Sequence, residues 1–288
     1  MNPLGQMNQA MEYLEKNLSG EIDFGQMSRI AGYSEYHFRR MFSYLAGMPL
    51  GEYIRCRKLA LAGDLLQEGK KVIDCAMLFG YNSPDAFSKA FYTMYGISPS
   101  QVKQKGASLK AFPPMTFQLT IKGGNKMDYR IVHKGPFRIV GFKKRITLQF
   151  SGVNTQMDSL NEKLTPEIIM ELKSLCNTEP MGILSVSANF EDHTVEGMEL
   201  DQYVCAATTK EPPESYDSLE VKESDWAVFT SVGPFPGALQ DTWARIYSEW
   251  LAASDYQLVN GPEMLWYGGT DFASPEFKTE IWVCVIKR

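Results

Sequence analysis

The sequence lacks any uninterrupted run of eighteen apolar residues, which argues against a transmembrane helix. Its N-terminus, MNPLGQMNQAMEYLEKN, has no cationic start followed by an apolar stretch, so we expect no signal peptide. Cysteine is sparse, with five residues and no CxxC pair, which argues against a zinc site and against a disulfide framework. We therefore expect a cytoplasmic protein with reduced thiols at Cys56, Cys75, Cys176, Cys205 and Cys284.

Several motifs of catalysis and cofactor binding are also missing. No GxGxxG follows a predicted strand and no Walker loop is present, so a nucleotide cofactor is not expected. The three histidines are scattered without HxxxH or His–Cys spacing, which argues against a metal site. No GxSxG elbow is present. We expect neither a cofactor, nor a metal, nor an enzyme.

The composition divides the chain of 288 residues into two parts. Residues 1–110 hold thirteen Lys and Arg against ten Asp and Glu, whereas residues 111–288 hold sixteen against twenty-four. A locally basic domain can bind DNA although the whole chain carries a charge of −5, because salt screens charges beyond roughly 10 Å. All five tryptophans lie in the second part: Trp226, Trp243, Trp250, Trp266 and Trp282.

Residues 1–108 show the periodicity of several short amphipathic helices. Gly32 suits a tight turn, and Ser34 is a preferred N-cap for the helix EYHFRRMFSYLAG, in which Phe38, Phe42 and Leu45 face inward. A helix, a glycine turn and a capped helix describe a helix-turn-helix, although one such unit is equally an ordinary helical hairpin with a solvated face. The face expected to be exposed carries Tyr36, Arg39, Arg40 and Ser43.

The same pattern occurs a second time. After Gly80, Ser83 is an N-cap and Pro84 stands at the first helical position, where its missing N–H costs nothing. The following helix buries Phe87 and Phe91. Chance explains this internal repeat poorly, and the repeat favours two helix-turn-helix units. The exposed face of the second helix carries Asp85, Ser88, Lys89 and Tyr92.

Residues 5–105 resemble the AraC/XylS family of transcription factors. The segments that carry the resemblance are GYSEYHFRRMF, GMPLGEYIRCRKLALAGDLL and IDCAMLFGYNSPDAFSKAFYTMYGISPSQVK. The resemblance implies a bacterial regulator whose two recognition helices enter successive major grooves of promoter DNA, roughly 34 Å apart, with RNA polymerase as a partner. It assigns base reading to the two sets of exposed residues named above.

The second recognition helix departs from the common pattern because it begins Pro84-Asp85-Ala86 and has few long donors. Asp85 could accept a hydrogen bond from cytosine N4 but would also repel phosphates. We therefore expect the first helix to carry more of the base discrimination. The helix N-termini near Ser34 and Ser83 can hold phosphates through free backbone N–H groups.

Residues 109–115 include Pro113-Pro114 and predict a linker. Residues 116–288 mix alternating strands with two amphipathic helices. The predicted strands are Thr116–Ile121, Asp128–His133 after a hairpin turn at 123–125, Phe137–Ile146, Gly182–Ala188, Gln202–Thr208, Trp226–Val232, Met264–Tyr267 and Glu280–Ile286, and the predicted helices are Thr155–Cys176, broken at Pro166, and Gly237–Leu251. The segment KGPF in the first half of this region is echoed by VGPFPG in the second half, which predicts two similar halves around one sheet and a ligand cleft at their junction. The fold class is an all-α domain followed by an α+β domain.

Aromatic rings beside an acid are the most specific chemical feature of the second part. Glu280 begins the last predicted strand, and Trp282 lies on the same face two residues later. A carboxylate flanked by rings suits a lipophilic cation. The alternative is that Glu280 is an exposed strand end and the tryptophans are core. The effector-binding candidates are Glu280, Trp282, Trp226, Phe235, Trp266 and Tyr267.

Residues 116–288 resemble the GyrI-like effector-binding domain of Rob- and BmrR-type regulators. The carrying segments are MDYRIVHKGPFRIVGF, DWAVFTSVGPFPGALQDTWARIYSEWL and EFKTEIWVCVIK. The resemblance implies a small-molecule effector, and it places Glu280 at the family's ligand-facing glutamate. Two alternatives stay open: a hydrolase of small electrophilic compounds with Glu280 as general base, and a domain that binds a protein partner.

Overall fold

The computed structural model describes residues 3–103, 109–118, 127–147, 154–193 and 197–287. The chain divides into two compact units, Met1–Leu119 and Thr120–Arg288, which we call the head and the body. Each unit is described by itself.

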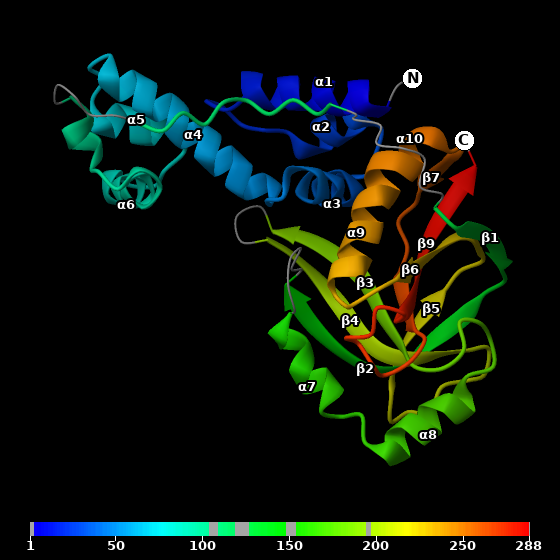
Figure 1. The fold of residues 1–288 in the computed structure, drawn as a ribbon. Helices are drawn as coiled ribbons and strands as arrows, with labels where there is room; N and C mark the ends of the chain where they lie inside the picture. The colour runs from blue at the N-terminus through cyan, green and yellow to red at the C-terminus, as the bar shows by residue number, and fades with distance from the viewer. Residues whose placement is uncertain (1–2, 104–108, 119–126, 148–153, 194–196, 288) are drawn as a thin grey trace. The chain divides into compact units, whose positions relative to one another are not determined.

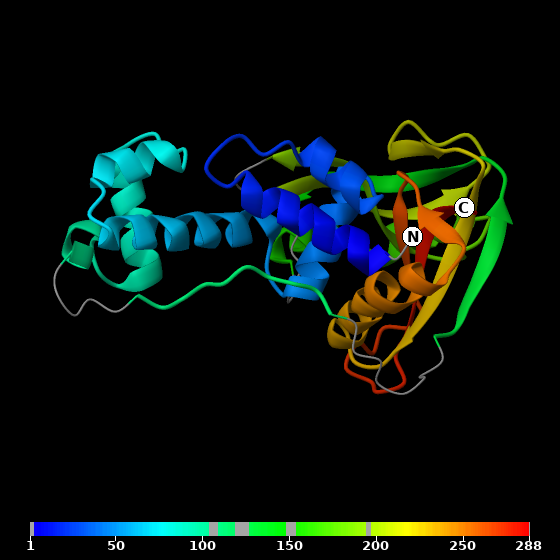
Figure 2. The same cartoon turned by 90° about the horizontal axis from the view of Figure 1, so that it is seen from above.

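The described part of the head is helical (Figures 1 and 2). The helix α4 has eighteen residues, about 27 Å of axis, and it joins two groups of shorter helices. The pairs α2–α3 and α5–α6 are the two helix-turn-helix units. The elements are α1 (Pro3–Lys16), α2 (Phe24–Ala31), α3 (Glu35–Ala46), α4 (Leu50–Gln67), α5 (Val72–Leu78), α6 (Pro84–Tyr95) and the 3-10 helix η1 (Pro99–Lys103).

Helix capping confirms the repeat predicted from the sequence. The Ser34 side chain accepts from the His37 N–H at the start of α3, and the Ser83 side chain accepts from the Ala86 N–H at the start of α6. Both helices end at a glycine with positive φ, Gly47 at 68° and Gly96 at 71°. Such a left-handed C-cap favours glycine because a Cβ would clash there.

A buried ion pair ties α1 to α4. The Arg57 Nη2 atom lies 2.9 Å from Glu15 Oε2, and the Tyr53 hydroxyl donates to Glu15 Oε1 at 2.7 Å. The two charged side chains are only 8% and 20% exposed. Because the two residues are forty-two positions apart in the sequence, their ion pair holds the first helix of the head against the long helix α4.

Residues 109–118 pack along the head. Arg57 donates to the Phe112 carbonyl, and the Met115 N–H donates to the Tyr53 hydroxyl at 3.0 Å. Asn8 exchanges two hydrogen bonds with the backbone of Phe117, at 2.8 and 2.9 Å. The strand predicted from Thr116 is wrong for its described residues 116–118, because these backbone groups bond to α1 and α4 side chains rather than to another strand. The rest of that predicted strand and the hairpin turn at 123–125 lie outside the described residues.

The body is built on one antiparallel sheet of nine strands in the described residues, with the order β1-β6-β9-β8-β3-β4-β2-β5 and β7 paired to β9. Each strand predicted from Asp128 onward overlaps an observed strand, with ends shifted by up to five residues, whereas β5 and β7 were not predicted. The strands are β1 (Tyr129–Lys134), β2 (Phe137–Thr147), β3 (Leu184–His193), β4 (Gly197–Thr208), β5 (Asp217–Val221), β6 (Ser224–Val232), β7 (Tyr256–Leu258), β8 (Glu263–Tyr267) and β9 (Lys278–Lys287).

The sheet is strongly coiled. Strands β6 and β2 stand five places apart, which would separate them by about 24 Å in a flat sheet. The rings of Trp226 on β6 and Phe137 on β2 nevertheless have centroids 6.1 Å apart. We call the side that curls around these rings the inner face. Its buried members include Ile139, Leu184, Val186, Tyr203, Cys205, Val228, Met264, Trp282 and Cys284.

The helices cover the opposite, outer face (Figure 1). Helix α8 (Pro166–Leu175) packs Leu172 against Val140 and Ala206. Helix α9 (Gly237–Arg245) continues through a π-helical turn (Ile246–Trp250) into α10 (Leu251–Ala253), and Trp250 packs on Phe229 of β6. The break predicted at Pro166 is confirmed, since a separate short helix, α7 (Asp158–Asn161), precedes α8.

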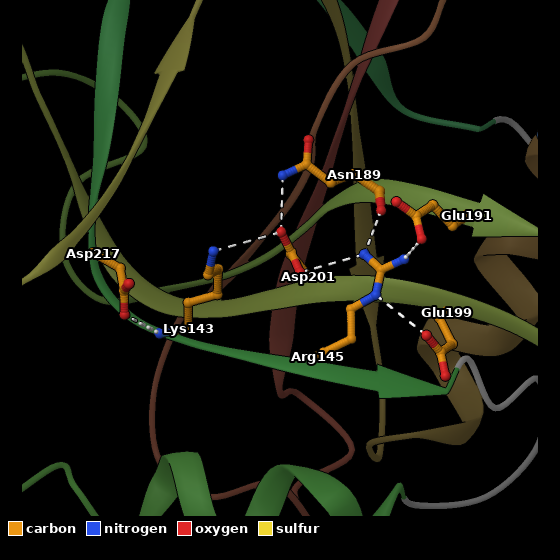
Figure 3. Close-up of polar contacts among 7 residues, drawn as sticks. All are labelled: Lys143, Arg145, Asn189, Glu191, Glu199, Asp201 and Asp217. Atoms are coloured by element: carbon orange, nitrogen blue, oxygen red, sulfur yellow. Dashed lines mark hydrogen bonds and ion pairs between the residues drawn. The ribbon is translucent and has the colours of Figure 1, made fainter.

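A polar network fixes the pairing of β2, β4 and β3 at one end of the sheet (Figure 3). Arg145 on β2 lies 3.3 Å from Asp201 and 3.5 Å from Glu199, both on β4, and 2.8 Å from Glu191 on β3. Its guanidinium also donates to the Asn189 carbonyl at 2.7 Å. Since each contact crosses between strands, the network opposes a slip in register.

Removing the Arg57 guanidinium is expected to destabilise the head by about 3 kcal/mol, because it leaves a mostly buried Glu15 charge uncompensated. Arg55→Ala is the matched control, since Arg55 is 54% exposed and its ion pair with Glu52 spans 3.7 Å. The control should cost within about 0.5 kcal/mol. Hydrogen exchange of α1 and α4 amides in Arg57→Ala reads the head separately, and protection equal to that of Arg55→Ala would contradict the assignment.

Burial lowers the pKa of His37 to about 3, with a further lowering by the nearby charge of Arg40. The ring stays neutral in the folded head, with Nδ1 2.9 Å from the Ser34 hydroxyl. The unfolded chain binds a proton near pH 6.5, so the head loses stability as the pH falls from 6.5 toward 3. His133 behaves oppositely, because its hydrogen bond to Asp225 raises its pKa.

Ring NMR signals of the histidines should therefore titrate differently. We expect the His37 signal to stay constant between pH 7.5 and 5, while the His133 signal moves with a midpoint above 6.5. The variants His37→Gln and His133→Gln assign the two signals among the three histidines of the chain. A His37 midpoint near 6.5 would show that the ring is hydrated in the folded head.

Candidate functional site

On the first recognition helix, α3, the residues predicted to read bases have little exposed surface. Arg39, Arg40 and Ser43 are buried, at 7%, 6% and 4% exposure, and Tyr36 is half-buried. The Arg39 guanidinium lies 4.0 Å from the Phe24 ring centroid and 2.8 Å from Glu35. These contacts hold the long side chain against its own unit, which periodicity alone does not reveal.

Arg40 is held by aromatic neighbours on the same helix. Its guanidinium donates to the Tyr36 hydroxyl and lies 5.8 Å from the ring centroids of both Tyr36 and Tyr44. Ser43 donates to the Arg39 carbonyl at 3.0 Å. Arg39, Arg40 and Ser43 therefore all make contacts within the first helix-turn-helix unit.

The second recognition helix does present its predicted face. Asp85, Lys89 and Tyr92 are exposed and Ser88 is half-buried, while Phe87 is fully buried beneath them. The core below α6 includes Leu59, Ala62, Leu66, Cys75, Ala76, Phe79 and Phe91. Helix α6 therefore exposes a cation, Lys89, and an aromatic ring, Tyr92.

On the inner face of the body, Glu280 is the centre of a charged and aromatic cluster. Arg130 donates to both of its carboxylate oxygens, at 2.9 and 3.0 Å. The Trp282 indole N–H donates to Glu280 at 3.1 Å. The Glu280 side chain is 13% exposed and that of Arg130 is 46% exposed. Glu280 is thus neither an exposed strand end nor an unpaired charge.

Two cations lie against the Trp282 ring. The Arg130 guanidinium is 5.3 Å from the ring centroid, and Lys134 Nζ is 5.9 Å from it. Lys134 also lies 4.9 Å from the Phe137 ring, and its ammonium donates to the Thr178 hydroxyl at 2.9 Å. Burial lowers the pKa of Lys134. The face therefore combines aromatic rings, one carboxylate and two positive groups.

The buried Trp226 ring contributes an unused donor. Its centroid is 6.5 Å from that of Trp282, and the side chain is fully buried. Its indole nitrogen has no hydrogen-bond partner among the described residues. A buried donor without an acceptor costs about 1–3 kcal/mol, so an acceptor supplied there would be bound favourably.

The remaining effector candidates are only partly brought together. Trp266 pairs directly with Glu280 across β8 and β9, and its indole N–H donates to the Met181 carbonyl at 2.8 Å. Phe235 and Tyr267 instead pack on each other, with centroids 6.1 Å apart, in a separate aromatic group that includes Phe272. The cluster around Glu280 thus contains Trp266, Trp282 and Trp226, and it does not contain Phe235 or Tyr267.

Sequence reasoning missed Arg130, Lys134 and Phe137. A signal was present, because Arg130, Val132 and Lys134 alternate along one predicted strand and therefore share a face. What the sequence did not give was that β1 pairs with β6, which pairs with β9. That order brings Arg130 within reach of Glu280, 150 positions later.

Two searches of the described residues gave negative results. They contain no group of three or more His, Cys, Asp or Glu side chains placed to hold a metal ion. None of their helices combines the length and the apolar character that crossing a membrane requires.

Two family models match the chain. Residues 127–286 match the GyrI-like small molecule binding domain, and residues 27–105 match a helix-turn-helix domain. The first match covers more than half of the chain, and it spans the sheet that carries Glu280 and Trp282.

Curated relatives are regulators of transcription. The HTH-type transcriptional activator AarP of Providencia stuartii is 36% identical over 95 residues, which are 33% of this chain and 70% of that protein. The uncharacterised HTH-type transcriptional regulator YbfP of Bacillus subtilis is 27% identical over 165 residues, and the match spans about half of each protein, 51% and 53%. A solved structure of SAV2435 bound to tetraphenylphosphonium covers 56% of this chain and 94% of its own, at 20% identity and a TM-score of 0.44.

The fold, the repeated helix-turn-helix and both matches agree on one assignment. The chain belongs to the GyrI-like small molecule binding domain family, and it is an AraC-type transcriptional regulator that joins this domain to an N-terminal helix-turn-helix head.

Proposed function

We propose that the chain is a one-component regulator whose head binds promoter DNA and whose body binds a small lipophilic effector on its inner face. It acts in the cytoplasm, where promoter DNA is available. The name of AarP as an activator supports transcriptional activation with RNA polymerase as the partner.

The exposed face of α6 supports DNA binding by the head. Lys89 and Tyr92 project from a helix whose N-terminus is capped by Ser83 and begins with Pro84. A lysine can contact phosphate, and an aromatic hydroxyl can donate to phosphate or a base edge. Helix α3 takes part at the second groove position, through Tyr36 and through Arg39 and Arg40 once their local contacts are exchanged for DNA contacts.

The cluster around Glu280 supports effector binding by the body. The buried rings of Trp226, Trp282 and Phe137 form the inner core beside the Glu280 carboxylate, and the Trp226 indole N–H is a donor without a partner among the described residues. These groups suit a lipophilic molecule that carries a positive charge, an acceptor atom, or both. Glu280 already accepts three hydrogen bonds, an arrangement that favours binding over proton abstraction by this carboxylate.

Substituting Lys89 by Ala should weaken DNA binding about equally for all sequences and reduce the slope of log affinity against log salt by about one. Lys16→Ala is the matched control, since Lys16 is an exposed lysine of the same unit on α1. Fluorescence anisotropy with a labelled promoter fragment at several salt concentrations gives the slope. Equal slopes for Lys89→Ala and the unsubstituted protein would remove α6 from the interface.

Arg40→Ala tests α3 in the same assay. We expect a loss of about 1–3 kcal/mol confined to one base position of the operator. If neither affinity nor base preference changes, Arg40 is a structural residue held by Tyr36 and Tyr44 and is not a reading residue.

Glu280→Gln tests the body. Because all five tryptophans lie after residue 119, intrinsic tryptophan fluorescence reports on the body. We expect saturable quenching by methyltriphenylphosphonium, a three-ring cation, and a lower affinity for it in Glu280→Gln. The neutral triphenylphosphine oxide should bind both proteins alike, and the exposed Glu223 provides the control substitution Glu223→Gln. Identical cation titrations for Glu280→Gln and Glu223→Gln would exclude Glu280 from the site.

A further inference from the structure

The position that a ligand cation would take at Glu280 is already filled by the protein. The Arg130 guanidinium binds both oxygens of the Glu280 carboxylate and lies over the Trp282 ring at 5.3 Å. A carboxylate on one side and an aromatic face on another are the two features that attract a lipophilic cation. Arg130 satisfies both at once.

Arg130 can leave this position without disturbing the sheet. It stands on β1, which pairs with β6 alone in the described residues, and its side chain is 46% exposed. The β1 backbone stays paired to β6 whichever way the long side chain points. Rotating the side chain therefore exchanges the Glu280 contacts for water at the sheet edge.

Lys134, the other cation beside Trp282, is held differently. The residue is 8% exposed, and its ammonium donates to the Thr178 hydroxyl and to the Glu179 carbonyl. These neutral acceptors belong to the segment after α8, and Lys134 makes no ion pair within the salt-bridge distance among the described residues. Of the two cations, Arg130 is the one that both occupies the carboxylate and faces solvent.

We propose that Arg130 is a tethered competitor at the effector site: a cationic effector must displace the Arg130 guanidinium from Glu280 and Trp282 to bind. This inference rests on the proposed effector binding. Arg130 then sets the threshold concentration and the selectivity, because a weakly interacting cation cannot outcompete a bidentate guanidinium, whereas a cation with larger ring area can. A neutral lipophile does not compete for the Glu280 carboxylate, so its binding does not require Arg130 to leave.

The test compares Arg130→Gln with the unsubstituted protein, using methyltriphenylphosphonium and neutral triphenylphosphine oxide. Arg130→Gln should bind the cation about tenfold more tightly, since Glu280 then lacks its internal partner. Its affinity for the neutral compound should stay within about twofold. Arg138→Gln is the matched control, because Arg138 is also an ion-paired arginine, but its partners are Glu211 at 2.7 Å and Glu220 at 3.3 Å rather than Glu280.

The double variant Arg130→Gln/Glu280→Gln tests whether the gain in cation affinity depends on Glu280. It should lose the gain in cation affinity, because the gain depends on a free Glu280 carboxylate. Circular dichroism spectra that match the unsubstituted protein establish that each variant is folded.

The outcomes separate the two proposals. If the unsubstituted protein binds either compound but Arg130→Gln binds the cation no more tightly, the competitor role is wrong and effector binding stands. If the cation binds Arg130→Gln alone, the competitor role is supported in its strongest form. If neither compound binds either protein, the lipophilic site of the proposed function fails, and the competitor role fails with it.

Discussion

The body depends on an interior strand of a coiled sheet, β9, being buried on both faces. Strand β9 hydrogen bonds to β6, β8 and β7. Its even-numbered residues Trp282 and Cys284 enter the inner core, while Ile281, Val283 and Val285 are buried on the other face. A single slip in register would exchange these two sets and place Glu280 among the residues under α9. The packing of buried residues on both faces of β9 therefore fixes the position of the Glu280 carboxylate.

Local sequence features were sufficient to predict the head. Ser34 and Ser83 as caps, Gly47 and Gly96 as C-caps and the phenylalanines beneath α3 and α6 act within a few residues of each other, so a reader of the sequence can recognise them. The contact of the Arg39 guanidinium was not predictable in this way, because its partner, the Phe24 ring, belongs to the preceding helix.

The candidate site of the body was predictable only in part, for a topological reason. Alternation along the last strand placed Glu280 beside Trp282, because strand geometry is local. The partner of Glu280 comes from the first strand of the sheet, and no local pattern gives the order of strands. The same limit explains why Phe235 and Tyr267 were grouped with Trp226. All three are aromatic residues in predicted strands or at their ends. Tyr267 and Trp266 are neighbours on β8, however, so their side chains point to opposite faces of the sheet, and Tyr267 packs on Phe235.

The two ends of the sheet have a consequence for how copies of the protein meet. In the described pairings β1 bonds only to β6 and β5 only to β2, so each leaves backbone groups unpaired along one edge. Both strands are short, with six and five residues, and both carry charge at exposed positions: Arg130 on β1, and Asp217 and Glu220 on β5. Short length and charged side chains are two of the features by which natural proteins keep an edge strand from pairing with another chain. The coiling that builds the inner face adds a third, because a flat edge is the better template for a new strand.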